Sequence, residues 1–230
     1  MAVIAQKTDA VFIDFYGTIA AGDRQAVEDT CASIVQTCGI PIPANKFAVL
    51  WGERFFRVVA ESNHADFRTL IECETTSLRQ TLRELGVERD VARFIDQLEA
   101  YWRDPPLHPD AVEFLRHVPV PVCCVSNADT HALMQAIDKH GLRFDAVISS
   151  ESVRSYKPDA KIFEHALDAL GVAAHRALHI GDSLHSDIAG ASAAGIRAAW
   201  IRREDRIHDI GNHDADHIVH SLVDVMPLLG

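Results

Sequence analysis

The second half of the chain alternates short apolar runs with segments of helical spacing, and this alternation constrains the fold more than any other feature. The apolar runs have strand length and occupy residues 120–127, 145–150, 176–183, 197–201 and 216–221. The segments with helical spacing are residues 111–118, 130–141, 158–171, 186–195 and 222–230. Strands that alternate with helices favour a parallel sheet covered by helices on both faces. We therefore predict an α/β fold with a Rossmann-like core.

The first strand of this sheet is expected far upstream, at residues 10–16. Between that strand and a Pro-rich boundary at residues 104–110, the spacing of apolar residues is helical and no convincing strand occurs. The helical spacing occupies residues 24–38, 45–61, 66–86 and 89–102. We predict that residues 1–20 and 105–230 form the α/β core and that residues 21–104 form an all-helical block inserted after the first strand.

Composition and charge narrow the class of protein. The chain has 230 residues, 48% of them hydrophobic, which is enough for a sizeable core. Its formal net charge of -11 argues against nucleic acid or an anionic membrane as the main partner. The five cysteines show no disulfide pattern, and no secretory leader or membrane-spanning apolar run occurs. We expect a cytoplasmic protein that acts on a small molecule.

Polar residues stand where several predicted strands end, or just before the helix that follows. They are Asp14, Ser126, Asn127, Lys157, Asp182 and Asp187. Because open parallel sheets bind ligands outside the carboxyl ends of their strands, we expect these side chains at one edge of the sheet. Neighbouring carboxylates repel each other unless a cation lies between them, and oxygen ligands suit magnesium. A carboxylate can also act as a covalent nucleophile, with a lysine neutralising the charge on a transferred group.

Four short motifs, in this order, resemble those of the haloacid dehalogenase-like hydrolase superfamily. They read DFYGT at residues 14–18, SNAD at 126–129, YKPD at 156–159 and GDSLHSD at 181–187. The inserted block resembles the helical cap of the phosphoglycolate-phosphatase-like and 2-haloacid dehalogenase branches. The resemblance covers essentially the whole chain and implies a hydrolase with an aspartate nucleophile.

The resemblance implies a role for each matching residue. Asp14 would be the nucleophile, Ser126 would bind the transferred group, and Lys157 would hold the charge of nucleophile and substrate. Tyr16 is the fourth candidate catalytic residue. The implied magnesium ligands are Asp14, the main-chain carbonyl of Tyr16, Asp182 and Asp187. The candidates for substrate binding are Thr18, Asn127 and, in the cap, Arg54.

Tyr16 departs from the phosphatase pattern, which carries a second aspartate at this position to protonate the leaving oxygen. A tyrosine, with an ordinary pKa of about 10, donates a proton weakly and is a poor base. An aspartate followed two residues later by tyrosine, glycine and threonine resembles the 2-haloacid dehalogenases, which need neither a metal nor a leaving-group acid. That branch also has an arginine where Gly52 follows Trp51 and a tyrosine where Phe163 stands, and its last motif differs from GDSLHSD.

These features leave several hypotheses open. The main one is a magnesium-dependent phosphohydrolase acting on a small phosphorylated metabolite, because GDSLHSD has the magnesium-binding form. The first alternative is a metal-independent 2-haloacid dehalogenase, because Tyr16 follows Asp14. A second alternative is a catalytically weak member that binds a ligand, because the acid–base aspartate is missing. A phosphonate hydrolase that uses the cap residue Lys46 is a minor option.

Overall fold

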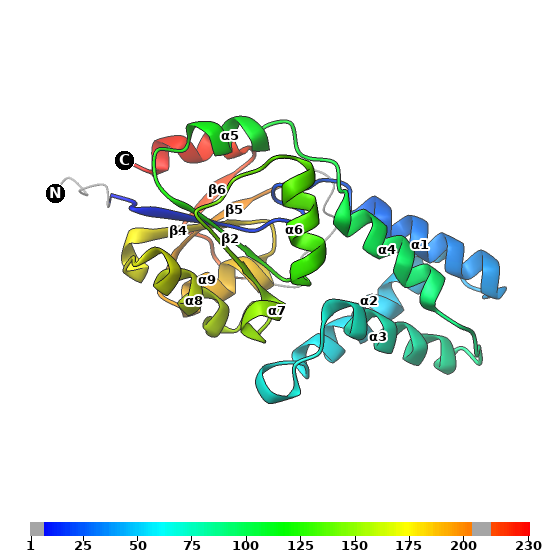
Figure 1. The fold of residues 1–230 in the computed structure, drawn as a ribbon. Coiled ribbons are helices and arrows are strands. Elements are labelled where there is room, and N and C mark those ends of the chain that lie inside the picture. The colour runs from blue at the N-terminus through cyan, green and yellow to red at the C-terminus, as the bar shows by residue number, and fades with distance from the viewer. Residues whose placement is uncertain (1–6, 204–212) are drawn as a thin grey trace.

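A computed structural model describes residues 7–203 and 213–230 of the chain. Within these residues, six parallel strands form one sheet in the order β3-β2-β1-β4-β5-β6 (Figure 1). The strands are β1 (Ala10–Ile13), β2 (Val122–Ser126), β3 (Ala146–Ser149), β4 (Ala177–Gly181), β5 (Arg197–Ile201) and β6 (His217–Val219). The chain fills one side of β1 first and then the other, so a topological switch point lies between β1 and β4. Open α/β sheets bind their ligands at this point.

Both faces of the sheet are buried under helices, which explains the continuous apolar runs. Val11 and Ile13 of β1 share one core cluster with Leu133, whereas Phe12 shares the opposite cluster with Phe163. The first face packs against α5 (Ala111–His117), α6 (Thr130–Lys139) and the 3₁₀ helix η4 (Leu222–Leu228). The second face packs against α8 (Ala160–Leu170) and α9 (Ala189–Ala193). The predicted Rossmann-like α/β fold is confirmed.

Three helical details differ from the prediction. Residues 222–228 form the 3₁₀ helix η4 rather than an α-helix, and Pro227 within it has no N–H to donate to an α-helical bond. A π-helical turn, η3 (Leu184–Ile188), precedes α9. The short α7 (Ser150–Val153) follows β3 directly. None of the helices in the described ranges is long and apolar enough to cross a bilayer.

The segment between β1 and α5 is helical, as predicted. It contains α1 (Asp23–Cys38), α2 (Ala44–Ala60), the 3₁₀ helix η1 (His64–Asp66), α3 (Leu70–Glu84) and α4 (Ala92–Arg103). These helices lie to one side of the sheet (Figure 1) and bury a cluster that includes Phe47, Trp51 and Phe94. Helix α3 begins at Leu70, later than the spacing predicts, because Thr69 and Glu72 form a capping box. The division into a core and a cap domain stays a prediction.

Candidate active site

Strand β1 and the turn after it place Asp14 at the switch point. The Asp14 backbone N–H donates to the Ile180 carbonyl at 2.9 Å, which continues the pairing of β1 with β4 by one residue. The turn passes through Gly17 at a φ of 93°, a conformation that favours glycine. A Cβ atom on Gly17 would lie 2.5 Å from Asp182 Oδ2. A glycine is therefore needed both for the turn and for the close approach of the Asp182 carboxylate.

The ammonium group of Lys157 lies at the centre of the site. Its Nζ donates at 2.6 Å to Asp14 Oδ1, at 2.6 Å to Asp187 Oδ1 and at 2.9 Å to the Val125 carbonyl, which uses all three of its N–H groups. The lysine and both aspartates are buried. Burial alone would lower the pKa of Lys157, but the two carboxylates raise it above its ordinary value. The lysine is therefore held in its charged form.

The two carboxylate oxygens of Asp14 have different surroundings. Oδ1 accepts the hydrogen bond from Lys157, whereas Oδ2 is buried and accepts none from any described residue. Burial raises the pKa of Asp14, and the Lys157 ammonium opposes the rise. The hydroxyl of Ser126, at the end of β2, is likewise buried with no partner among the described residues. Oδ2 is thus the Asp14 oxygen that can react without breaking a hydrogen bond.

Asp187, on η3, is held from three directions. Its Oδ1 accepts from Lys157 and, at 2.9 Å, from Nε2 of His179, while its Oδ2 accepts from the Ser183 backbone N–H at 3.1 Å. Burial would raise the pKa of Asp187, but Lys157 and His179 hold it well below its usual range. His179 was not predicted to belong to the site. The only sequence signal for it is a histidine inside the apolar run at residues 176–183.

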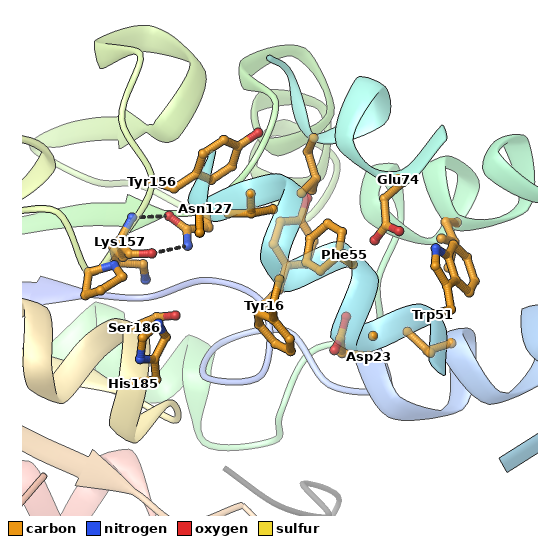
Figure 2. Close-up of a pocket in the computed structure, with 18 of the residues that line it drawn as sticks. Tyr16, Asp23, Trp51, Phe55, Glu74, Asn127, Tyr156, Lys157, His185 and Ser186 are labelled. Carbon is orange, nitrogen blue, oxygen red and sulfur yellow. Dashed lines mark hydrogen bonds between the residues drawn. The ribbon is translucent and has the colours of Figure 1, made fainter. Parts of the chain in front are cut away.

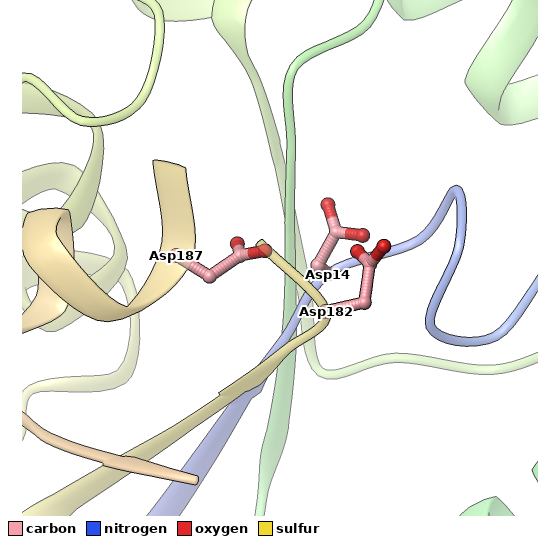
Figure 3. Close-up of side chains that lie close together, drawn as sticks. All are labelled: Asp14, Asp182 and Asp187. Carbon is pink, nitrogen blue, oxygen red and sulfur yellow. The ribbon is translucent and has the colours of Figure 1, made fainter. Parts of the chain in front are cut away.

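Asp14, Asp182 and Asp187 form an acidic cluster at the carboxyl ends of β1 and β4 (Figure 3). One ligand atom from each lies within 4.8 Å of the others. Thr18 Oγ1 donates to Asp182 Oδ1 at 3.5 Å, and the indole N–H of Trp200 donates to the Asp182 carbonyl at 2.9 Å. The structure therefore contains the cluster of carboxylates on which the magnesium prediction depends.

The phenol of Tyr16 is tied to the helical segment. Its hydroxyl donates to the Trp102 carbonyl, at the end of α4, at 2.7 Å. Burial raises the pKa of Tyr16 well above its ordinary value, and the charge of Asp14 adds to the rise. The hydroxyl is therefore neutral, and its proton is committed to a backbone acceptor.

Asn127 and Arg54 occupy different positions relative to the site. The backbone N–H of Lys157 donates to Asn127 Oδ1 at 2.7 Å, and Asn127 Nδ2 donates back to the backbone carbonyl of Lys157 at 3.1 Å. Asn127 therefore holds the loop that carries the lysine. Arg54 instead forms an ion pair with Glu84 of α3 and is not among the described residues that line the adjoining cavity. The structure thus brings the predicted residues together with the exception of Arg54, and their roles stay predictions.

A cavity of about 680 Å³ extends from the site to the helical segment (Figure 2). Lys157 lies at one end of it, Tyr16 and Phe55 lie in the middle, and Trp51 and Glu74 lie on the far side. Its walls are largely apolar, and its size suits a small molecule. Glu74 was not predicted, because an acid on an amphipathic helix most often faces water.

Comparisons with known proteins match most of the chain. Residues 8–195 match the haloacid dehalogenase-like hydrolase family. The chain is 26% identical over 215 residues to (S)-2-haloacid dehalogenase H-109 of Pseudomonas putida, covering 89% of this chain and 90% of that protein. It is 34% identical over 139 residues to a phosphoserine phosphatase of Thermus thermophilus, covering 57% and 55%. The solved L-2-haloacid dehalogenase of Xanthobacter autotrophicus has a TM-score of 0.77 at 23% identity, covering 96% and 98%.

These matches correct the main prediction, a magnesium-dependent phosphohydrolase. The similarity to a haloacid dehalogenase extends over 89% of this chain, whereas the phosphatase match covers 57%. The physical reason lies at Tyr16, where a phosphatase needs a group that protonates the leaving oxygen and later activates water. The Tyr16 hydroxyl is instead bound to the Trp102 carbonyl. The family match extends over residues 8–195, far more than half of the sequence, and this chain therefore belongs to the haloacid dehalogenase-like hydrolase family.

Proposed function

We propose that this chain is a hydrolytic dehalogenase, which uses Asp14 to displace halide from a small organic halide. The observation that carries the proposal is the bond from the Tyr16 hydroxyl to the Trp102 carbonyl, which leaves no proton donor at that position for a leaving group. A halide leaves as a stable anion and needs no proton, so a site without this donor remains competent. The similarity to (S)-2-haloacid dehalogenase H-109 over 89% of the chain supports the same reaction.

The reaction proceeds in two steps. In the first, Asp14 Oδ2 attacks the carbon that bears the halogen; a carbon–oxygen bond forms, and the halide departs with the electrons of the broken bond. In the second, water attacks the carboxyl carbon of the resulting Asp14 ester, and the bond from that carbon to Oδ2 breaks. The product alcohol keeps Oδ2, and Asp14 regains an oxygen from water. One organic halide and one water thus give one alcohol, one halide ion and one proton.

Lys157 and its partners orient the nucleophile in this proposal. The ammonium holds Asp14 through Oδ1 and leaves Oδ2 free to react. Asp187 fixes the ammonium from the other side, and His179 fixes Asp187. Because all these groups are buried, their interactions are stronger than the same contacts in water. The arrangement is therefore preorganised before the substrate binds.

The helical segment supplies the rest of the proposed site. Residues 21–104 would act as a cap that covers the cavity, excludes water and selects the substrate. Tyr16 links the two parts, because its ring lines the cavity and its hydroxyl holds the end of α4. A cytoplasmic location and the lack of nucleic-acid and membrane partners stay predictions.

The acidic cluster has the donor set of a magnesium site, because carboxylate oxygens suit this ion. Asp14 Oδ2 is buried without a hydrogen bond, and the Asp182 carboxylate lies beside it, so these two groups fit a cation. Both oxygens of Asp187 already accept hydrogen bonds, which favours Asp14 and Asp182 as ligands. The Tyr16 carbonyl is the further ligand that the family resemblance implies. Bound magnesium would neutralise negative charge at the sheet edge. It would also occupy the oxygen proposed as nucleophile, so halide displacement should not require it.

Bromide release tests the proposed function. The wild-type enzyme is incubated with 2-bromopropanoate, bromoacetamide and (2-bromoethyl)trimethylammonium chloride, and bromide is measured by ion chromatography with and without EDTA. We expect release from at least one compound, unchanged by EDTA and abolished by Asp14→Asn. The matched control is Asp96→Asn, on an exposed position of α4, which should keep full activity. The proposal fails if no compound gives enzyme-dependent bromide, or if Asp14→Asn retains the wild-type rate.

A further inference from the structure

Among the described residues, the cavity that ends at Lys157, beside Asp14, has no free cation that could bind a substrate carboxylate. Among the described residues that line it, none is an arginine and Lys157 is the single lysine. The three N–H groups of that lysine are already bound to Asp14, Asp187 and the Val125 carbonyl. His185 lies at the same end of the cavity as Lys157 (Figure 2). The described residues of the far end therefore offer no positive charge to an anionic group.

The far end carries two acidic side chains instead. Glu74 of α3 and Asp23 of α1 both line it. The carboxyl of Glu74 points into the cavity (Figure 2), and no described residue forms a hydrogen bond or ion pair with it. Burial and the charge of Asp23 raise the pKa of Glu74 to about 8. A third acid in the lining, Asp159, already has a partner, because its Oδ2 lies 3.0 Å from His64 Nε2.

Aromatic rings line the cavity between Lys157 and Glu74. Tyr16 and Phe55 lie between the two ends, and Trp51 lies on the same side as Glu74 (Figure 2). The faces of aromatic rings attract cations, with tryptophan the strongest of them, and the attraction increases where water is excluded. A carboxyl without a partner among the described residues, at the end of an aromatic cavity, favours a ligand with a positively charged nitrogen. Once Glu74 is ionised, above about pH 8, it would attract such a cation and repel a carboxylate or phosphate at the same place.

We propose that the substrate carries a cationic nitrogen, bound by Glu74 and the aromatic walls while its reactive carbon reaches Asp14. This inference rests on the proposed dehalogenation and names the substrate class for it: a haloalkyl ammonium compound rather than a 2-halocarboxylate. The substrate would lie along the cavity with its charged end in the helical segment. Glu74 would then determine specificity without taking part in bond making or breaking.

Binding of unreactive probes tests the inference without depending on the chemistry. Choline, its uncharged analogue 3,3-dimethylbutan-1-ol and the anion 3,3-dimethylbutanoate are titrated into the full-length protein by calorimetry at about pH 8.5. We expect choline to bind at least tenfold more tightly than the alcohol and the anion not to bind. Glu74→Gln should weaken choline binding at least tenfold and leave the alcohol unchanged. Glu53→Gln, on an exposed position of α2, is the matched control and should bind choline like the wild type.

The outcomes separate this inference from the proposed function. Choline binding no tighter than that of the alcohol, or unaffected by Glu74→Gln in a variant with a wild-type circular dichroism spectrum, would overturn the inference. If 2-bromopropanoate still releases bromide in that case, the proposed dehalogenation is kept and only the cation site is refuted. Choline binding that depends on Glu74, in an enzyme that releases bromide from no compound, would keep the cation site and refute the dehalogenation.

Discussion

Replacing Glu74 with glutamine should stabilise the fold by an amount that grows as the pH rises. Burial, aided by Asp23, moves the pKa of Glu74 from 4.5 to about 8 in the folded protein. Between these two values the folded state holds the proton more tightly than the unfolded chain, so stability falls as pH rises and levels off above about pH 8. The full shift corresponds to at most about 5 kcal/mol. Because Glu74 is partly accessible to water, we expect about 1–3 kcal/mol.

Urea unfolding of the wild type and the glutamine variant at about pH 4, 6.5 and 9 measures this effect. The difference in free energy of unfolding should be small at pH 4 and largest at pH 9. Burial raises the pKa of the neighbouring thiols of Cys31 and Cys73, and both thiols are present in the wild type and the variant, so their titration cancels in the comparison. Glu53→Gln should show no such trend. A constant difference would refute the reasoning, because it would mean that the pKa of Glu74 is the same in the folded and unfolded states. A wild type that gains stability over the Glu74→Gln variant at high pH would also refute it, because Glu74 would then be ionised and paired.

Three further substitutions test other contacts. Tyr16→Phe removes the hydrogen bond to the Trp102 carbonyl and should lower the free energy of unfolding by about 1–3 kcal/mol. Bromide release should persist in this variant, and loss of all activity would instead show that the hydroxyl takes part in the reaction. Lys157→Met removes the cation that pairs with the buried carboxylates of Asp14 and Asp187, which should cost about 3–5 kcal/mol and abolish bromide release. A rate within tenfold of wild type would contradict its role. Gly17→Ala should lower the melting temperature, because its Cβ would meet a carboxylate; an unchanged melting temperature would show that the turn adapts.

Much of the fold could be predicted, because strands buried on both faces leave continuous apolar runs in the sequence. Strand β1, which contains Phe12, is apolar throughout for this reason, since alternate residues pack against helices on opposite faces. Helix boundaries were less predictable where local hydrogen bonding decides them. Leu70 begins α3 because Thr69 provides the cap, and Pro227 belongs to a 3₁₀ helix although the surrounding residues have helical spacing.

The residues at the strand ends could be located from the sequence, because parallel strands bring their carboxyl ends to one edge. Residues that reach the site from the helical segment could not be located from the sequence, because helical spacing does not show which turn of which helix faces the sheet. Arg54 faces Glu84 rather than the cavity, while Glu74, which carried no motif, lines it. The predicted phosphohydrolase was wrong, because the motif at residues 181–187 has the magnesium-binding form while Tyr16 occupies the position of the acid–base aspartate of phosphatases.

The most direct test of the central claim is a single turnover in water enriched in oxygen-18. Excess enzyme is mixed with a bromide substrate from the panel, and peptides that contain Asp14 are analysed by mass spectrometry alongside the alcohol product. If Asp14 forms the ester and water attacks its carboxyl carbon, the label enters Asp14 and the first-turnover alcohol contains none. Label found in the alcohol during the first turnover, with none in Asp14, would contradict the account, because water would then have attacked the substrate carbon directly.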